Sequence, residues 1–454
     1  MLSPTRSPVR ARSSSLIFGD ERIVADELRE RAARLAAGLA ARGIGRGDRV
    51  ALLLPNGPAF AISFLAIAQA GAVVVPLNPQ FKRAELEFCY ADAGVQMVLD
   101  DEQEIARLIE EHGGHDPEPR SADDEALLAY SAGCTGHPKR VPRTSGQLWW
   151  EADSIARTMG LTPDDTIFCS IPMFHAYGLG CCFLAALSSG ADLVIADPHK
   201  PLTLAREDVL RLIEREQVTV FPAVPFVFRT LAESQIAADL SSVRLCYSAG
   251  NALPRSTFDA FDRAFGVPIR QLYGLTETGA VTINTAADPW ETAASVGMPM
   301  PGIEIEVLDD AGSALETGRI GDITVRSPAM TRLYGEPFAT GDRGRLDDAG
   351  GLTITGRRKV LIDVRGDKVD PIEVEDVLAV HPRVRDVVVV GVPSGIEGEE
   401  LIKAVVVGEN GCSERELIRF CRERLANYKV PHQVEFRDEI PRSSLGGVLR
   451  KYLV

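Results

Sequence analysis

The chain has 454 residues, of which 45% are hydrophobic and 25% are charged, a composition typical of a globular protein with more than one domain. Its formal net charge of −15 at pH 7 would repel phosphate backbones, so we expect no nucleic-acid partner. Its eight cysteines form no CxxC pair and no ligand-like spacing with its seven histidines, which argues against zinc and against a disulfide framework. We therefore expect reduced thiols and a cytoplasmic location.

The N-terminal part of the chain alternates between predicted helices and strands. Apolar residues at Leu28, Ala32, Leu35 and Leu39 follow one helix face and predict a helix over 24–42 that ends at Gly43. The pattern then predicts strands at 50–54, 72–77 and 95–99 and helices at 59–70 and 83–93. The longest apolar run, 61–77, is too broken to cross a membrane, so no membrane span is expected.

A polar loop at 110–126 interrupts this alternation, which resumes with strands at 167–172, 192–196, 218–221 and 243–248 and a helix at 205–216. Such alternation predicts an α/β fold with mostly parallel sheets covered by helices. After about residue 300, short strands with Gly and Asp turns predict a small antiparallel, barrel-like subdomain. The last segment predicts an α+β domain with helices at 371–382 and 413–428 and buried strands at 384–393 and 402–408.

The segment LAYSAGCTGHPKRV, residues 128–141, is rich in small residues and contains a lysine. Glycines let backbone N–H groups turn inward and cradle an anion, and a lysine adds a point charge. The segment does not match the Walker A pattern. By itself it fits a phosphate loop and a plain surface turn about equally well.

Seven segments in order make this chain resemble a known superfamily: 131–139, 171–179, 247–254, 271–279, 339–359, 365–375 and 440–453. From about Val24 to Leu453 the chain resembles the adenylate-forming superfamily of acyl-CoA synthetases, nonribosomal-peptide adenylation domains and luciferases. The resemblance implies an adenylate- and acyl-binding domain at 1–357 with two helix-covered sheets. It also implies a mobile C-terminal domain at 358–454, joined by a hinge at 357–360.

The resemblance implies a nucleotide site. Asp342 would accept hydrogen bonds from the ribose hydroxyls, Thr276 would contact phosphate, and Glu277 would be the single carboxylate ligand of Mg²⁺. The other implied adenine and nucleotide contacts are Gly250, Asn251, Ala252, Gln271, Leu272, Tyr273, Gly274, Leu275 and Arg357. The implied phosphate-loop contacts are Ser131, Gly133, Thr135, Gly136 and Lys139.

An acyl pocket and a CoA contact follow from the same resemblance. His175 would be a gate beside the acyl carboxylate, although a lone histidine is more often a core residue. The implied pocket comprises Phe174, His175, Phe221, Val224, Ser248, Ala249, Gly250 and Leu275, and core packing accounts for Phe221 equally well. Lys359 would be the hinge residue. The segment Arg365, Gly366 and Asp367 would meet CoA after the small domain turns, where glycine permits close backbone approach.

The tail departs from the superfamily pattern. A G-K-[IV]-L-R motif is expected there, and its lysine stabilises charge while pyrophosphate departs, but this chain has Gly447 at the lysine position. Losing one such contact typically costs roughly 10²–10³ in rate. Lys451 lies four residues further on, and the Gly446-Gly447 pair argues against a helix that would bring it back. The phosphate loop departs too, with Ala132 and Cys134 in place of hydroxyls and Arg140 in place of glycine.

These departures concentrate on triphosphate handling. We therefore expect an acyl-CoA ligase homologue that converts an acyl-adenylate and CoA to acyl-CoA and AMP, with adenylation impaired or lost. Its partners would be CoA, a carboxylic acid delivered as its adenylate, and a separate adenylating enzyme; ATP would serve only if adenylation survives.

Three alternatives stay open. The chain could be a complete ATP-dependent ligase, including one with an engineered Gly447. It could be a non-catalytic protein that binds adenylates or CoA. It could also transfer the acyl group to a carrier protein instead of free CoA.

Overall fold

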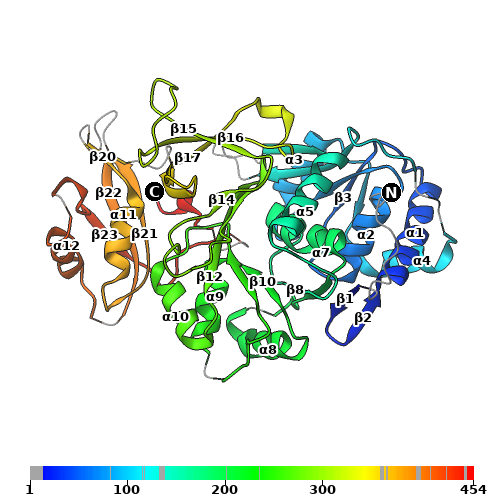
Figure 1. Ribbon diagram of the computed structural model, residues 1–454, viewed down its shortest axis with the longest axis horizontal. Coiled ribbons are helices and arrows are strands. Elements are labelled where there is room, and N and C mark those ends of the chain that lie inside the picture. The colour runs from blue at the N-terminus through cyan, green and yellow to red at the C-terminus, as the bar shows by residue number, and fades with distance from the viewer. Residues whose placement is uncertain are drawn as a thin grey trace. The chain divides into compact units, whose positions relative to one another are not determined.

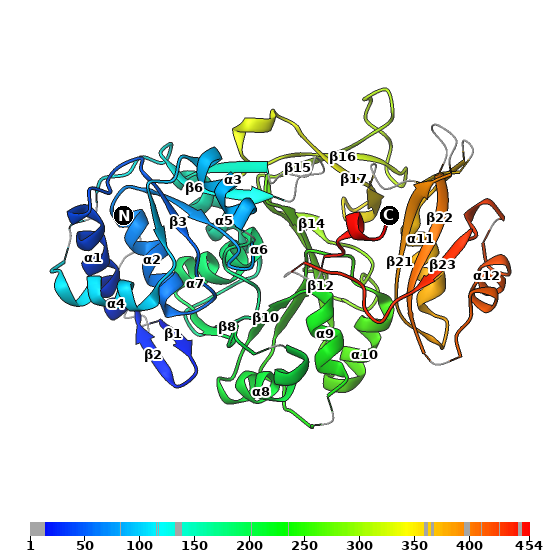
Figure 2. The ribbon, with the colours of Figure 1, turned by 180° about the vertical axis from the view of Figure 1, so that it is seen from behind.

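The computed structural model describes residues 14–454 except 82, 115, 117, 132–138, 201, 235, 358–361, 365–366, 395–399, 410, 426 and 444–446. The chain divides into two compact units (Figures 1 and 2). Unit 1 comprises residues 1–305, 325–338 and 350–352, and unit 2 comprises 306–324, 339–349 and 353–454. The predicted domain boundary at 357–360 stays a prediction.

Unit 1 begins with a five-stranded sheet in the order β5-β3-β4-β6-β7. The first four strands are parallel, and β7 runs antiparallel to β6. Their bounds are Met97–Leu99, Arg49–Leu52, Val73–Pro76, Glu125–Ser131 and Lys139–Thr144. Helices α1 to α4 accompany them, at Ala25–Ala41, Pro58–Gln69, Arg83–Ala93 and Glu102–Glu111.

Helix α1 follows the predicted pattern. Leu28, Ala32, Leu35 and Leu39 are all buried, as the spacing of one apolar helix face requires. Gly43 has φ near +82°, the left-handed conformation that commonly ends a helix. The alternating first half of the chain is therefore confirmed as a helix-covered, mostly parallel sheet.

A second, nine-stranded sheet has the order β14-β13-β12-β11-β10-β8-β9-β1-β2. From β1 to β12 in this order the neighbours are parallel, whereas β2, β13 and β14 are antiparallel additions. The bounds in sheet order are Met298–Pro299, Gly279–Ile283, Ile269–Leu275, Leu245–Ser248, Val220–Ala223, Thr166–Cys169, Asp192–Ile195, Ser15–Phe18 and Glu21–Val24.

Helices α8 (Leu202–Arg215), α9 (Pro225–Ala232) and α10 (Arg255–Phe265) share one buried core with the central strands of this sheet (Figure 2). Aromatic rings fill that core, and the Phe168 and Phe221 rings meet edge to face at 5.3 Å between centroids. Helix α5 (Ser145–Thr158) begins with a capping box in which Thr144 and Gln147 bond reciprocally. The parallel strands leave their carboxyl ends at one edge, where ligands generally bind in such sheets.

A charged network joins the amino ends of β8, β10 and β11, at the edge of the sheet away from the candidate site. Asp165 accepts hydrogen bonds from Arg244 Nε and Nη2, both at 2.8 Å, and from Thr219 Oγ1 at 2.7 Å. Burial alone would favour the protonated acid, but the hydrogen bonds from Arg244 and Thr219 prevail and lower the pKa of Asp165 to about 2.

We expect Asp165→Asn to lower the free energy of unfolding at pH 7 by about 1.5–3 kcal/mol, the worth of hydrogen bonds to a charged group. Because the pKa of Asp165 is lower in the folded chain than in the unfolded chain, this stabilisation is present above about pH 4 and is lost as the pH falls toward 2. Denaturant unfolding should show that the difference in free energy of unfolding between variant and parent is smaller at pH 3 than at pH 7. The exposed neighbour Asp164, changed to Asn, serves as the control, and a gap independent of pH would refute the assignment.

Most residues of a four-stranded sheet in the order β15-β16-β17-β18 belong to unit 2; the strands have the bounds Glu304–Leu308, Gly321–Arg326, Phe338–Leu346 and Leu352–Arg357. After the antiparallel pair β19 (Ile362–Val364) and β20 (Asp367–Val369), helix α11 (Pro371–Ala379) precedes a three-stranded sheet. There β21 (Val384–Pro393) and β22 (Glu400–Gly408) are antiparallel, and β23 (Gln433–Phe436) pairs parallel with β22.

The helix predicted over 413–428 is shorter in the structure. Helix α12 spans Glu414–Arg422, and its start is capped by Ser413, whose side chain accepts from Glu416 N–H. A turn and the short 3₁₀ helix η4 (Asn427–Lys429) follow, and Lys429 pairs with Glu373 at 2.7 Å. The prediction was therefore wrong in its last turn and a half, where a contact distant in sequence takes over.

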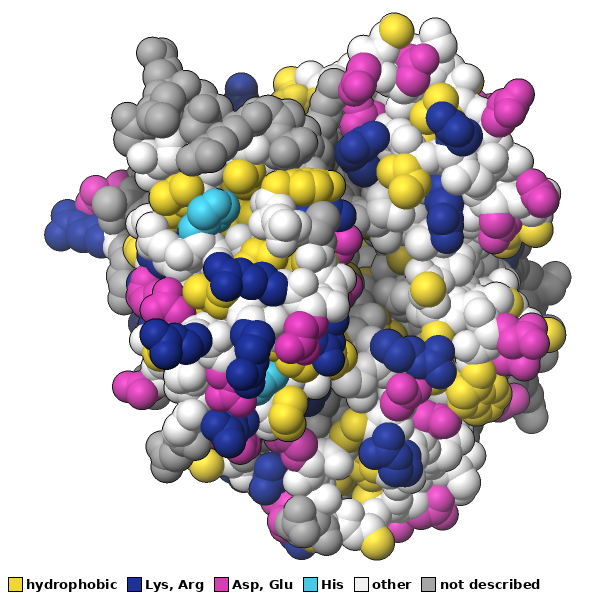
Figure 3. Space-filling view, turned by 90° about the vertical axis from the view of Figure 1, so that its left-hand side faces the viewer, with side chains coloured by type: hydrophobic (Ala, Val, Ile, Leu, Met, Phe, Trp, Pro, Cys, Tyr) yellow, Lys and Arg dark blue, Asp and Glu magenta, His cyan; other side chains and the backbone are white. Residues whose placement is uncertain are grey.

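The surface carries charges of both signs. On the face shown in Figure 3, Lys and Arg side chains are interspersed with Asp and Glu side chains. Elsewhere in the chain, Lys403 pairs with Glu435 at 2.7 Å. None of the helices formed by the described residues combines the length and apolar character that a membrane crossing requires.

Candidate active site

Strand β12 and the turn that joins it to β13 carry most of the predicted nucleotide contacts. The register shifts between Tyr273 and Gly274, and a Cβ at Gly274 would lie 2.5 Å from Gly279 O. Glycine is therefore required at 274. Thr278 Oγ1 accepts from Leu275 N at 3.3 Å and donates to Gly279 O at 3.0 Å, which closes the turn that carries Thr276. Gln271 and Leu272 are buried in β12, and Gln271 Nε2 donates to Ala293 O.

Glu277 in this turn meets the start of the predicted phosphate loop. Ser131 Oγ donates to Glu277 Oε1 at 2.8 Å, and Thr331 N donates to Glu277 O at 2.8 Å. Of the other predicted loop residues, Lys139 begins β7, whereas Gly133, Thr135 and Gly136 lie outside the described residues. Thr331 was missed because nothing in its sequence context marks it.

The donor set at this place suits a magnesium ion shared with a substrate. Among the residues that the structure describes, no group of three or more His, Cys, Asp or Glu could hold a metal ion. Mg²⁺ commonly binds through one or two carboxylates together with phosphate oxygens and water. Glu277 therefore fits as a single protein ligand for such an ion.

Asn56 holds the backbone ahead of His175. Asn56 Oδ1 accepts from Met173 N at 2.6 Å, and Asn56 Nδ2 donates to Ile171 O at 2.8 Å. His175 precedes the short helix α6 (Ala176–Gly178), which continues as the π-helix η1 (Leu179–Leu184) and then α7 (Ala185–Ser189). π-Helical turns are rare and frequent at functional sites. The sequence signalled neither Asn56 nor the π-helix.

The His175 ring is neutral at physiological pH. Burial lowers the pKa of His175 to about 4, and its Nε2 has no hydrogen-bond partner among the described residues. The ring lies 4.6 Å from the Phe174 ring, measured between centroids. A neutral imidazole with one free nitrogen can border an acyl group without placing a charge beside it.

We expect the stability of the protein to record this lowered pKa. Between about pH 6.5 and pH 4 the unfolded chain binds a proton at His175 that the folded chain does not, so stability falls as the pH falls through this window. Between pH 7.5 and pH 5, the free energy of unfolding of the parent should fall by about 1–2 kcal/mol more than that of His175→Phe. His199→Phe, at an exposed histidine, is the control. Equal pH dependence in both variants would contradict the expectation.

The predicted acyl residues gather at the carboxyl ends of β10 and β11. Ser248 ends β11 opposite Ala223, and Gly250 follows with φ near +84°, its Cβ position 3.6 Å from Val224. Tyr177 Oη donates to Ala223 O, at 3.3 Å, and so ties the His175 segment to these strand ends. Ala249 is buried as well, whereas Asn251 and Ala252 are exposed.

Ser248 Oγ is buried and without a hydrogen-bond partner among the described residues. Phe221 is fully buried among Phe168, Phe228 and Phe261, which fits the core-packing alternative. Its place in an acyl pocket stays a prediction.

Asp342 belongs to unit 2. Its side chain is 4% exposed in β17, and its N–H donates to Thr340 Oγ1 at 3.0 Å. Arg357 ends β18 and Asp367 begins β20. Lys359, Arg365 and Gly366 lie outside the described residues, so the hinge and CoA assignments stay predictions.

The C-terminal tail forms a hairpin that is closed by Arg442 and Val448, and Gly447 directly precedes Val448. Arg442 and Val448 form an antiparallel bridge, and Ser443 N donates to Gly447 O at 2.7 Å. Gly447 N in turn donates to Ser443 Oγ at 3.1 Å. The expectation that Gly447 is not helical is confirmed. Lys451 lies beyond the hairpin in the short 3₁₀ helix η5 (Arg450–Tyr452).

Side chains away from Gly447 hold this hairpin in place. Arg442 donates twice to the Asp386 carboxylate, at 2.8 and 2.7 Å, and Arg450 Nη2 donates to Glu375 Oε1 at 2.9 Å. These two arginines therefore already have carboxylate partners. Of the atoms of the described residues, a Cβ built on Gly447 would meet Ser443 Oγ alone, at 3.1 Å, and the φ of Gly447 lies outside the left-handed region. The backbone at 447 therefore accepts a side chain.

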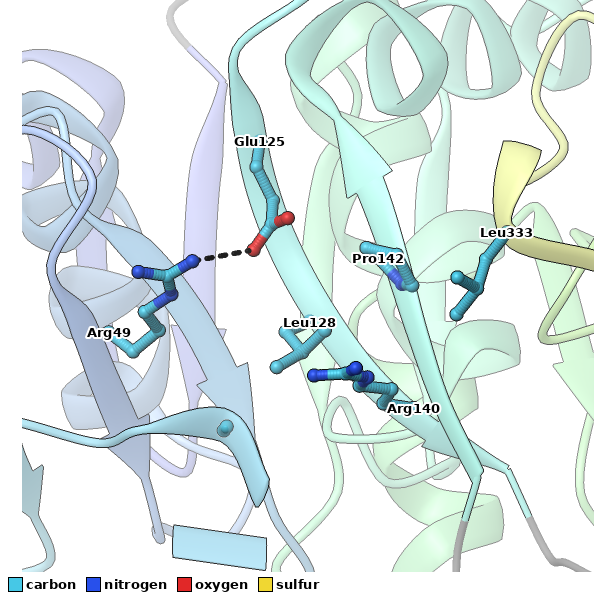
Figure 4. Close-up of a pocket in the computed structure, with 7 residues that line it drawn as sticks. Arg49, Glu125, Leu128, Arg140, Pro142 and Leu333 are labelled. Atoms are coloured by element: carbon cyan, nitrogen blue, oxygen red, sulfur yellow. Dashed lines mark ion pairs between the residues drawn. The ribbon is translucent and has the colours of Figure 1, made fainter. Parts of the chain in front are cut away.

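A separate pocket of about 270 Å³ opens on the face of β6 and β7 (Figure 4). Arg49 pairs with Glu125 there at 3.9 Å. Arg140, which replaces the expected glycine, points into the same hollow. The lining contains none of the predicted catalytic, nucleotide or acyl residues; it comprises Arg49, Ala93, Glu125, Leu128, Arg140, Pro142 and Leu333.

Comparison with known proteins identifies close relatives over the whole chain. The model of the AMP-binding enzymes matches residues 6–335, and that of the AMP-binding enzyme C-terminal domain matches residues 373–446. A feruloyl-CoA synthase from Amycolatopsis sp is 33% identical over 99% of this chain and 95% of its own length. The long-chain-fatty-acid–CoA ligase FadD13 from Mycobacterium tuberculosis is 30% identical over 96% of this chain and 93% of its own length.

Solved structures agree with this result. ATP-bound MatB from Rhodopseudomonas palustris superposes with a TM-score of 0.89 at 27% identity, covering 98% of this chain and 96% of MatB. The o-succinylbenzoate CoA synthetase MenE from Bacillus subtilis, in complex with its acyl-adenylate intermediate OSB-AMP, gives a TM-score of 0.88 at 29% identity, covering 98% and 96%. The predicted fold class is thereby confirmed.

Proposed function

Because the chain belongs to the family of AMP-binding enzymes, among the acyl-CoA ligases of the adenylate-forming superfamily, we propose that it is specialised for the second half of the ligase reaction. That it is an enzyme of the thioester-forming acyl-CoA synthetase type follows from the family itself. In the proposed reaction an acyl-adenylate and CoA give acyl-CoA and AMP. Activation of the acid by ATP would be impaired or lost.

The observation that carries this proposal is the glycine at position 447, next to the bridge between Arg442 and Val448. The superfamily motif assigns this position a lysine that stabilises charge while pyrophosphate leaves. In this chain position 447 has no side chain, and Arg442 and Arg450 are engaged by Asp386 and Glu375. No described arginine of the hairpin is therefore free to replace the missing ammonium group.

The second half-reaction has different needs. The CoA thiol releases its proton to solvent, the thiolate sulfur attacks the acyl carbonyl carbon to form the C–S bond, and the C–O bond to phosphate breaks with AMP as the leaving group. Because the anhydride is already activated, the protein must mainly position the thiol and exclude water. Asp342 would hold the ribose, Thr276 the phosphate, and neutral His175 would border the acyl carbonyl. A magnesium ion at Glu277 would neutralise phosphate charge.

The acid is proposed to be aromatic or fatty. The predicted pocket is apolar except for His175 and Ser248, and these two side chains offer unpaired Nε2 and Oγ atoms to a polar group. The feruloyl-CoA synthase and the long-chain ligase among the relatives support both classes. A separate adenylating enzyme would supply the adenylate, and CoA or a carrier-protein thiol would accept the acyl group.

Two assays of the purified protein test the proposal. Synthetic feruloyl-adenylate or a long-chain acyl-adenylate with CoA should give thioester and AMP. The corresponding free acids with ATP, Mg²⁺ and CoA should give no pyrophosphate. Pyrophosphate release as fast as thioester formation would instead identify a complete ligase. Tight adenylate binding by calorimetry without any turnover would identify a non-catalytic binder, and both results contradict the proposal.

A further inference from the structure

A buried ion pair lies behind the candidate site. Arg143 in β7 and Glu151 in α5 have side chains that are 2% and 6% exposed, and Arg143 Nη2 donates to Glu151 Oε2 at 2.7 Å. Such a pair rarely stabilises a fold more than apolar residues of the same size, because both charges lose their hydration. The presence of this ion pair is therefore better explained by a role beyond packing.

The second carboxylate oxygen of Glu151 accepts a hydrogen bond from β13, directly after the turn between β12 and β13. Glu151 Oε1 accepts from Ala280 N at 2.8 Å. Gly279 has φ near +71°, and a Cβ there would lie 2.7 Å from Glu151 Cδ. The carboxylate thus occupies space that exists because residue 279 lacks a side chain.

The same carboxylate also reaches the segment that follows His175. A Cβ at Gly180, in the π-helix η1, would lie 3.1 Å from Glu151 Oε1. Glu151 therefore contacts the first two residues of β13, directly after the turn that carries Thr276 and Glu277, and on its other side the extension of the His175 segment. Arg143 fixes which way the carboxylate faces.

We propose that Glu151, oriented by Arg143, is a positioning residue that holds the 276–280 turn in register with the His175 segment. This inference rests on the proposed function, which places nucleotide contacts in the turn and the acyl gate at His175. Glu151 need not touch a substrate. A charge-assisted hydrogen bond to one backbone N–H is short and directional, so it sets the turn more sharply than apolar packing would.

Two double variants isolate the hydrogen bond from the charges. Arg143→Met with Glu151→Gln removes both buried charges but keeps an oxygen acceptor for Ala280 N. Arg143→Met with Glu151→Met removes the charges and the acceptor together. Neither variant leaves a buried unpaired charge, so both should fold. Their difference reports on the acceptor alone.

We expect the Met/Met variant to turn over feruloyl-adenylate roughly 10²-fold more slowly than the Met/Gln variant, the usual cost of a misplacement near 1 Å. Its Kd for AMP, measured by calorimetry, should rise about tenfold, which corresponds to about 1.4 kcal/mol. The KM for CoA should stay equal in the two variants, and the melting temperature of the Met/Met variant should fall only slightly, because one buried backbone N–H loses its acceptor. The Met/Gln variant therefore acts as the rescue.

Two results would overturn the positioning role. One is equal kcat and equal AMP affinity in the two double variants. The other is a loss of activity that only follows a lower melting temperature. Failure of the proposed function is distinguishable, because it is measured in the parent protein, either as fast pyrophosphate release from ATP or as the absence of acyl-adenylate turnover, while the AMP titrations of the two variants still report on Glu151.

Discussion

Replacing Gly447 with lysine is expected to raise the rate of ATP-dependent pyrophosphate release by roughly 10²–10³-fold, the typical worth of one preorganised contact to developing charge. The structure supports the fit of this substitution. Among the described residues, a Cβ at 447 meets the flexible Ser443 hydroxyl alone, and the backbone there is not left-handed. The new ammonium group would extend from a backbone that is already held by its hydrogen bonds to Ser443.

The hairpin should keep its shape in this variant because its anchors lie elsewhere. Arg442 remains bound to Asp386 and Arg450 to Glu375, and Leu453 stays fully buried in the core of unit 2. Gly447→Met is the matched control, since it adds a side chain of similar length without the charge. Isotope exchange between labelled pyrophosphate and ATP, in the presence of the acid, measures the restored step.

Thioester formation from synthetic acyl-adenylate should change little in Gly447→Lys. If Gly447→Lys and Gly447→Met have the same effect on isotope exchange, a missing positive charge at position 447 is not what limits adenylation. If neither variant gains activity while acyl-adenylate is still consumed, the departures at Ala132, Cys134 and Arg140 of the phosphate loop become the limiting ones.

Gly178→Ala is expected to lower turnover of acyl-adenylate by roughly 10²-fold, because the backbone around His175 must move by about an ångström. A Cβ at 178 would lie 2.3 Å from Pro172 O and 2.8 Å from Ile171 O. Both are backbone atoms, and Asn56 binds Ile171 O from the other side, so the turn cannot yield cheaply. Overpacking of this kind also costs typically 1–3 kcal/mol of stability.

Gly45→Ala is the control for this experiment, because no atom of a described residue lies within 4 Å of its Cβ position and its φ is not left-handed. Steady-state kinetics with feruloyl-adenylate and CoA, together with thermal unfolding, compare the two variants. Near-parental turnover in Gly178→Ala would show that the His175 turn does not need its present geometry.

The sequence predicted those features that depend on local pattern. The apolar stripe of α1 and its Gly43 terminus follow from helix periodicity and glycine conformation. The non-helical tail at Gly447 followed from the paired glycines. Each of these depends on residues that are neighbours in the chain.

The sequence did not predict features made by distant residues. Asn56 is 115 positions from Ile171, to whose carbonyl it donates, and Glu151 is 129 positions from Ala280, whose N–H it accepts. The C-terminal shortening of α12 likewise reflects tertiary contacts of the residues that follow it. A polar residue inside a helix pattern carries no sign of the backbone group it will meet.

The anchoring of the tail has a consequence for how such an enzyme arises. The hairpin is stabilised by Arg442, Arg450 and Leu453, so we expect the identity of residue 447 to have little influence on whether the C-terminal part folds. If another protein provides the activated acid, as the proposed function requires, a lysine at 447 is not needed, and its loss would carry no folding penalty. Under that proposal, one reaction could be divided between two proteins by a single replacement, and the change would be reversible.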